Sequence, residues 1–321
     1  MLAPSGLDRP LGAPETTRSD MTLSADGLQR RARDRRTQAP SGARMALITA
    51  VMVVAPVGGL AAFVFLGQSD PIPLARLSSA DAHALAFDPQ DADRLLFGHH
   101  GGLLESSDGG RTWAAGTLAA GDAMNINVGG DGSVQIAGHE LYVGSQDSGA
   151  TWQPIDNDLP GLDLHSYVGD PAEPGHAWTF AAGYGLFETT DGGASWELRQ
   201  EGNWGALKAY RRADRTILVG IGPEGLAESS DAGGTWTLLA YPGAPLSGGL
   251  AVAADGSAIY AATIRGLRRS DDGGASWRST GWETPALAVA VSPMDPSLLV
   301  AVDDAMNVYR STDGGASWPG G

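Results

Sequence analysis

An eight-residue phrase that occurs six times constrains this chain more than any other feature. It first reads Ser-Ser-Asp-Gly-Gly-Arg-Thr-Trp, at residues 106–113. It returns at 145–152, 189–196, 229–236, 270–277 and 311–318, always as Ser/Thr-x-Asp-x-Gly-x-Ser/Thr-Trp. Successive tryptophans are separated by 39, 44, 40, 41 and 41 residues. A period of about 40 residues indicates repeated supersecondary units, and strand-rich units of this length predict a β-propeller.

Each residue type in the phrase suits a tight turn. The aspartate can accept hydrogen bonds from N–H groups of its own turn. The glycine supplies a backbone with positive φ, and the tryptophan is an apolar plate that can fill the gap between sheets. The phrase therefore predicts a hairpin corner that is pinned to the core. We assign a structural role to its six aspartates: Asp108, Asp147, Asp191, Asp231, Asp272 and Asp313.

The spacing of the phrases also predicts the blades. Residues 71–321 divide into six units of about 42 residues, the length of a four-stranded blade. In the first unit, apolar stretches at 84–87, 94–98 and 102–105 predict strands a, b and c, and the phrase then makes the turn into strand d. The sequence therefore predicts an all-β chain with a single six-bladed β-propeller.

The last unit has no room for its own fourth strand. Only Pro-Gly-Gly follows the tryptophan of the sixth phrase, at position 318. Residues 71–77 stand before the first strand a, where strand d stands in the other units. We expect this segment to pair with blade six and close the ring, which removes open sheet edges.

The chain before the repeats predicts a membrane anchor. Residues 1–44 contain eight arginines and five acidic residues, and we expect a disordered, basic, cytoplasmic tail. Residues 45–67 carry no charge and are long enough to cross a bilayer as a helix. The basic flank places the N-terminus in the cytoplasm and the propeller on the periplasmic or extracellular side. A cleaved signal peptide is the alternative, and translation could also start at Met21.

Charge and cysteine content exclude several classes of function. Residues 70–321 contain 13 basic and 32 acidic residues, a net charge of −19. An acidic body repels phosphates, so we expect no nucleic-acid partner. The chain has no cysteine, which excludes disulfides, thiolate nucleophiles and cysteine-ligated metals.

Histidines and aspartates are expected at one mouth of the ring. In blades one and three, Asp81-Ala82-His83 and Asp163-Leu164-His165 stand just before strand a. The b–c turns of blades one and two carry the further metal-ligand candidates His100 and His139, with His99 and Glu140 beside them and Asp122 and Asn125 nearby. The four aligned imidazoles beside carboxylates would suit zinc or copper. Asp81 and Asp163 are also candidate catalytic carboxylates. The alternative is hydrogen bonding around a wet channel.

The other half of the mouth carries aromatic and charged residues. Trp204 and Trp282 are not part of the phrases and lie in the loops before strand a, with Lys208 and Tyr210 close to the first. An exposed indole beside polar groups could stack on a sugar. We therefore assign these four residues, with Glu140, to ligand binding. The alternative is that each tryptophan packs over its own blade.

The repeated phrase resembles the Asp box of BNR-repeat propellers. The segments 82–89, 98–103 and 163–165 resemble a bacterial group called glycosylhydrolase-like, and the chain more loosely resembles the photosystem II assembly-factor propellers. The resemblance implies that the boxes are structural and lie away from the binding face. Sialidases of the superfamily carry Arg-Ile-Pro before the first blade, where this chain has Pro71-Ile72-Pro73, so a sialidase is not expected. The two-ring xyloglucanases are also a poor match to a single ring.

Three functions follow as expectations. The first is a membrane-anchored, extracytoplasmic module that binds a ligand or a membrane-protein partner, because the structural repeats are complete without a matching catalytic set. The second is a glycosylhydrolase-like enzyme that acts on a glycan at the mouth. The third is a metal-binding propeller.

Overall fold

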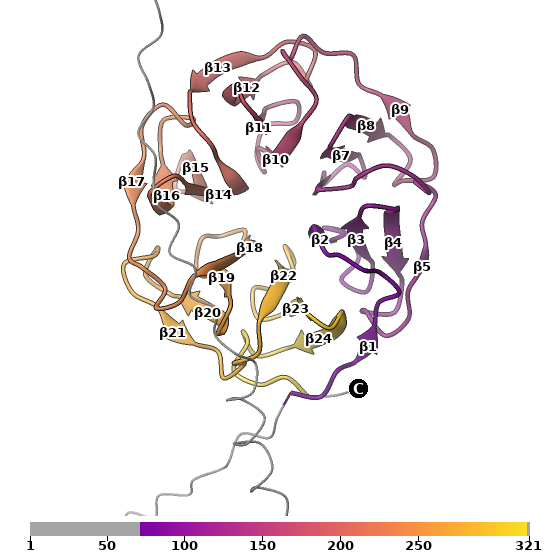
Figure 1. Cartoon of the computed structure of the whole chain (residues 1–321), viewed down its shortest axis with the longest axis vertical. Coiled ribbons are helices and arrows are strands. Elements are labelled where there is room, and N and C mark those ends of the chain that lie inside the picture. The colour runs from indigo at the N-terminus through magenta and orange to yellow at the C-terminus, as the bar shows by residue number, and fades with distance from the viewer. Residues whose placement is uncertain (1–70, 320–321) are drawn as a thin grey trace, which may run out of the picture. The chain divides into compact units, whose positions relative to one another are not determined.

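Six four-stranded antiparallel sheets stand around a common axis in the computed structural model, which describes residues 71–319 (Figure 1). This confirms the predicted all-β, six-bladed propeller. No helix able to span a bilayer occurs within 71–319. The predicted tail at 1–44 and anchor at 45–67 lie outside the described residues.

Each blade follows the chain from the innermost strand outward, except blade six. Blade one contains β2 (Ala84–Phe87), β3 (Leu95–His99), β4 (Gly102–Ser106) and β5 (Ala114–Ala115). Blade two contains β6 (Asn125–Val128), β7 (Val134–Gly138), β8 (Leu141–Ser145) and β9 (Gln153–Pro154). Blade three contains β10 (Leu164–Gly169), β11 (Ala177–Ala181), β12 (Gly185–Thr189) and β13 (Glu197–Gln200).

The second half of the ring repeats the arrangement. Blade four contains β14 (Gly205–Arg212), β15 (Arg215–Gly222), β16 (Gly225–Ser229) and β17 (Thr237–Leu238). Blade five contains β18 (Leu246–Val252), β19 (Ile259–Thr263), β20 (Gly266–Ser270) and β21 (Arg278–Ser279). Blade six contains β22 (Ala286–Val291), β23 (Leu299–Asp303), β24 (Asn307–Ser311) and β1 (Ala75–Arg76).

The outermost strand of blade six comes from the start of the described chain. Ala75 of β1 pairs with Val308 of β24, and the N–H of Leu74 also donates to the Val308 carbonyl at 2.7 Å. The N–H of Leu77 donates to the Met306 carbonyl at 2.8 Å. The segment 71–77 therefore joins the first and last blades of the ring (Figure 1).

The six phrases form the turns between the third and fourth strands. In the first phrase, the Asp108 carboxylate accepts hydrogen bonds from the backbone N–H of Thr112 at 2.9 Å and from the Ser106 hydroxyl at 2.9 Å. The hydroxyl oxygen of Ser106 in turn accepts from the N–H of Gly110 at 2.9 Å. Gly110 has φ +92°, and a glycine with positive φ stands at this position in all six copies. The aspartate oxygens are therefore occupied within the turn.

Apolar side chains fill the spaces between neighbouring blades. Between blades five and six, Tyr260, Trp282, Tyr309 and Trp318 belong to one buried cluster. A comparable cluster lies at each of the other five blade boundaries. Because the blades are held by these clusters, the loops at the ends of the sheets are held at fixed distances from one another.

Candidate metal centre

One end of blades one to three carries the histidines and aspartates. Asp81 and His83 stand just before β2, and His100 follows β3 directly. Because β2 and β3 are antiparallel, the start of the first and the end of the second meet at the same end of the blade. His139 follows β7 in the same way and forms an isolated bridge with Asp163 at the start of blade three.

The strand register places three aspartates at equivalent positions. Ala84 pairs with Gly98 in blade one, and Asn125 pairs with the equivalent Ala137 in blade two. Three residues before these innermost-strand positions stand Asp81 and Asp122, and Asp163 has the same place in blade three. The residue two positions later is His83 in blade one, Met124 in blade two and His165 in blade three.

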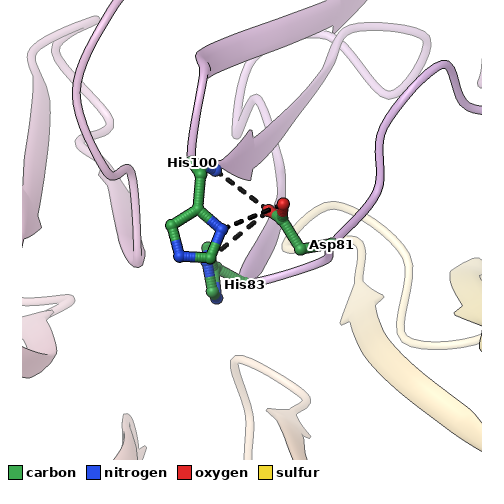
Figure 2. A group of neighbouring side chains, drawn as sticks. All are labelled: Asp81, His83 and His100. Carbon is green, nitrogen blue, oxygen red and sulfur yellow. Dashed lines mark hydrogen bonds and ion pairs between the residues drawn. The ribbon is translucent and has the colours of Figure 1, made fainter.

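Asp81, His83 and His100 form the first group, which we call group one (Figure 2). The Nδ1 atom of His100 lies 2.9 Å from an Asp81 oxygen and 3.3 Å from Nε2 of His83. The Nε2 atom of His83 lies 3.6 Å from the other Asp81 oxygen. The backbone N–H of His100 donates to Asp81 at 2.9 Å, which fixes the carboxylate against the turn. Three donor atoms therefore face one point.

His139, Asp163 and His165 form group two. The Nε2 atoms of the two histidines lie 3.2 Å apart. One Asp163 oxygen lies 3.1 Å from the His139 nitrogen and 2.9 Å from the His165 nitrogen. All three residues are exposed, whereas Asp81 and His83 of group one are half-buried. Group two therefore opens more widely to solvent.

Asp122 lies between the two groups. Its Oδ2 atom is 2.7 Å from Nδ1 of His139 and 3.6 Å from Nε2 of His100. Its Oδ1 atom is 3.2 Å from Nε2 of His83. Asp122 is only 8% exposed, and its two carboxylate oxygens face three imidazole nitrogens, the nearest at 2.7 Å. A buried carboxylate is costly unless such charged or hydrogen-bonding groups compensate it.

Electrostatics in group one reflect these contacts. Burial lowers the pKa of His83, although the nearby Asp122 favours its charged form. The hydrogen bond to Asp81 raises the pKa of the exposed His100. Burial alone would raise the pKa of Asp81, but hydrogen bonds from His100 outweigh it, so that the pKa is lowered. Asp81 is therefore ionised at neutral pH.

The two groups fit the donor spacing of a transition-metal shell. Ligand atoms 2.0–2.1 Å from a tetrahedral centre lie about 3.3–3.4 Å from one another. The separations between candidate donors run from 2.9 to 3.6 Å, with His83 and His100 facing different oxygens of Asp81 in group one. Neutral imidazole and carboxylate are ligands of zinc and of oxidised copper. Each group has three candidate ligand residues, one fewer than a tetrahedral shell requires.

Not every histidine predicted at this mouth joins the groups. The Nδ1 atom of His99 accepts a hydrogen bond from the N–H of Gly101 at 3.1 Å, and its ring lies against Phe97. Glu140 is exposed in the turn beside His139, with φ +52°. Four of the five expected histidines therefore meet. Asp122, which the sequence placed only near the site, is the residue that connects them.

The prediction that Trp204 and Trp282 form a sugar-stacking surface is wrong. Trp204 is 5% exposed and stacks on the phrase tryptophan Trp236, with ring centroids 3.9 Å apart. Trp282 is fully buried, with its ring 4.8 Å from that of Tyr309 and 4.9 Å from that of Trp318. Burial of a large apolar ring is strongly favourable, so both loops fold back over their blades. Neither indole face is open to a sugar.

Tyr210 lies away from the expected ligand, whereas Lys208 lines a cavity that reaches the mouth. Tyr210 is buried, and its hydroxyl meets the Arg212 guanidinium at the opposite end of β14, so the prediction for Tyr210 is wrong. Lys208 is half-buried on the axis of the ring. It lines a cavity of about 50 Å³ shared with His83 and a cavity of about 960 Å³ at the other end, near His176. Burial lowers the pKa of Lys208.

Comparisons with known proteins support the fold. A family model described as photosynthesis system II assembly factor YCF48 matches residues 77–225. A GH74 enzyme from Niastella koreensis aligns at 19% identity and a TM-score of 0.52, covering 74% of this chain and 46% of its own. A structure described as YCF48 bound to D1 peptide aligns at 19% identity and a TM-score of 0.49, covering 79% and 84% of the two chains.

A further similar structure is a xyloglucanase of family GH74 from Xanthomonas campestris. It aligns at 20% identity and a TM-score of 0.47, covering 75% of this chain and 43% of its own. The chain thus spans less than half the length of either GH74 chain. No curated protein matches the chain. The chain is therefore a six-bladed β-propeller, and its residues 77–225 are similar to the assembly-factor family model.

Proposed function

We propose that this propeller binds divalent transition-metal ions at the mouth formed by blades one to three. The observation that carries the proposal is the convergence of four imidazoles on three carboxylates, one of which is buried. A bound cation would add positive charge to this cluster and would engage the imidazole nitrogens that face one another at 3.3 and 3.2 Å.

The donor set favours zinc or copper in its divalent state. Calcium and magnesium prefer shells made of oxygen atoms, whereas each group here offers two nitrogens and one oxygen. Monovalent copper prefers thiolate and thioether ligands, and the chain contains no cysteine. When bound with three protein ligands, such an ion keeps a position for water or for a group from a partner.

We also propose a binding role rather than catalysis on glycans. The family model that matches residues 77–225 describes an assembly factor, which supports a protein partner. The tryptophans that would have stacked on a sugar are buried. Asp81 and Asp163, the candidate catalytic carboxylates, lie within 3 Å of imidazole nitrogens. On the sequence alone, we place the propeller outside the cytoplasm and tethered through residues 45–67, with a membrane protein as its partner.

Metal analysis of the purified full chain in detergent tests the proposal. After stripping with a chelator and dialysis against zinc or copper(II), we expect the wild type to retain metal and the double variant His83→Ala, His165→Ala to lose it. His99→Gln is the matched control, because His99 adjoins His100 but lies outside both groups. We expect this control to retain metal as the wild type does. A wild-type chain that holds no more metal than the dialysis buffer would overturn the proposal.

A further inference from the structure

We infer that the mouth is built for two metal ions, one in each group, and that Asp122 is the outer carboxylate shared by both. The inference rests on the proposed function, since it concerns how the same mouth holds its ions. The supporting observation is that the imidazole–carboxylate contacts fall into two separate groups, which Asp122 connects.

The donor atoms converge on two points rather than one. Within each group the donor atoms all lie within 4.8 Å of one another. His100 turns its Nδ1 atom to Asp81, and His139 turns its Nε2 atom to Asp163. The two nitrogens of one imidazole point in different directions, so a ring cannot place both on a single ion. The other nitrogen of each of these two rings faces Asp122.

Carboxylates and imidazoles therefore alternate across three blades. The order is Asp81, His100, Asp122, His139, Asp163, and the four steps measure 2.9, 3.6, 2.7 and 3.1 Å. The aspartates come from the loops before the innermost strands, and the histidines come from the b–c turns. Asp122 is the midpoint, where the two groups are connected.

Asp122 can select the tautomer of His139. Ligation through Nδ1 of His100 requires that its N–H be on Nε2, which lies 3.6 Å from Asp122, beyond a direct hydrogen bond, so that Asp122 acts on His100 through its charge. Ligation through Nε2 of His139 requires that its N–H be on Nδ1, which lies 2.7 Å from Asp122. A metal-ligating histidine usually donates its second N–H to such a carboxylate, and loss of that partner lowers metal affinity by about 10–100-fold. Asp122 is thus a positioning residue for the ion of group two and a negatively charged neighbour of the ion of group one.

The two sites are unequal. The Oδ1 atom of Asp122 also lies 3.2 Å from Nε2 of His83, so that two carboxylates flank group one. In group two, the two Nε2 atoms that would bind the ion have only the Asp163 carboxylate beside them. All three members of group two are exposed. We therefore expect the ion in group one to bind more tightly, and the ion in group two to exchange its open-position ligand more readily.

Cobalt(II) titration of the stripped full chain tests this inference. Cobalt absorbs visible light when bound by nitrogen and oxygen ligands, so that filling is followed directly and bound metal is counted by elemental analysis. We expect two ions per wild-type chain. His83→Ala and His165→Ala should each retain one ion, the double variant none, and His99→Gln two.

Asp122→Asn tests the shared carboxylate. We expect it still to bind two ions, with the affinity of group two lowered about 10–100-fold and that of group one lowered less. If Asp122→Asn does not fold, Asp122→Glu keeps the charge on a longer arm and is expected to weaken group two. Unchanged affinity at group two would overturn the role of Asp122.

The outcomes separate the two proposals. A single ion that is lost in His83→Ala and also in His165→Ala would overturn the two-site inference and leave metal binding intact. Absence of binding in the wild type would overturn the proposed function itself. The inference would also be contradicted if the wild type bound two ions but His83→Ala and His165→Ala did not each remove one of them.

Discussion

Closure of the ring can be tested through one leucine. Leu77 follows β1, is only 4% exposed and belongs to the apolar cluster between blades six and one. Its N–H donates to the Met306 carbonyl, so its side chain and backbone both fasten the first segment to the last blade. The change Leu77→Ala keeps the backbone bond and removes the buried side chain.

The expected loss is large for a single substitution. Truncation of a buried leucine to alanine costs about 2–5 kcal/mol, depending on how far the cavity collapses. For a domain of this size, each kcal/mol lowers the melting temperature by about 2–4 °C. We therefore expect Leu77→Ala to melt roughly 5–15 °C below the wild type. The ends of the ring meet here, so we also expect faster proteolysis of the segment 71–77.

Ile72→Ala is the matched control. Ile72 is an aliphatic residue in the same segment but is 59% exposed, so its truncation should change stability by no more than about 0.5 kcal/mol. Both variants are compared by circular dichroism melting of the full chain under equal metal conditions. Equal effects of the two changes, or a loss below about 1 kcal/mol for Leu77→Ala, would refute closure by this segment.

Three further changes test the core, a phrase turn and the axial lysine. Trp282→Ala should cost about 3–5 kcal/mol in thermal unfolding, while Tyr241→Ala, at a side chain 67% exposed, should change little; a stable Trp282→Ala chain would contradict the packing. The turn hydrogen bonds lower the pKa of Asp231 to about 2. Ionised Asp231 should therefore contribute roughly 1 kcal/mol to the free energy of unfolding after solvent screening. This contribution should be complete above pH 4 and vanish toward pH 2; if Asp231→Ala showed the same pH dependence of stability as the wild type, the contribution would be excluded. Burial lowers the pKa of Lys208, so Lys208→Met should stabilise the chain near pH 7, with a gain that shrinks as pH rises toward the ordinary lysine pKa; a pH-independent difference would disprove this.

The ring could be predicted because its signals are local and repeated. Each phrase determines its own turn through bonds between residues two to four positions apart, such as those of Asp108 to Ser106 and Thr112. The glycine pattern follows from backbone conformation, since Gly110 and its five equivalents all have positive φ. Such interactions do not depend on distant parts of the chain. Their spacing was therefore enough to predict the number of blades.

The site was harder to predict because it depends on contacts between blades. Alignment of the blades placed His83 and His165 at one mouth, but it could not show that His99 turns toward Phe97. Nor could it show that Trp282 is buried, because the exposure of a loop residue depends on what the loop packs against. A usable signal for Asp122 was present, since it occupies the same position in blade two as Asp81 in blade one.

The candidate site lies on blades one to three because equivalent positions in the other three blades carry residues that cannot bind a metal ion. The position that holds His83 in blade one and His165 in blade three holds Trp204 in blade four, Gly248 in blade five and Leu287 in blade six. None of these three can ligate an ion. A histidine in a b–c turn reaches only the carboxylates of its own blade and the next. The two proposed metal sites, which share a carboxylate, must therefore stand on consecutive blades, and here three consecutive blades carry all the candidate donors of both groups.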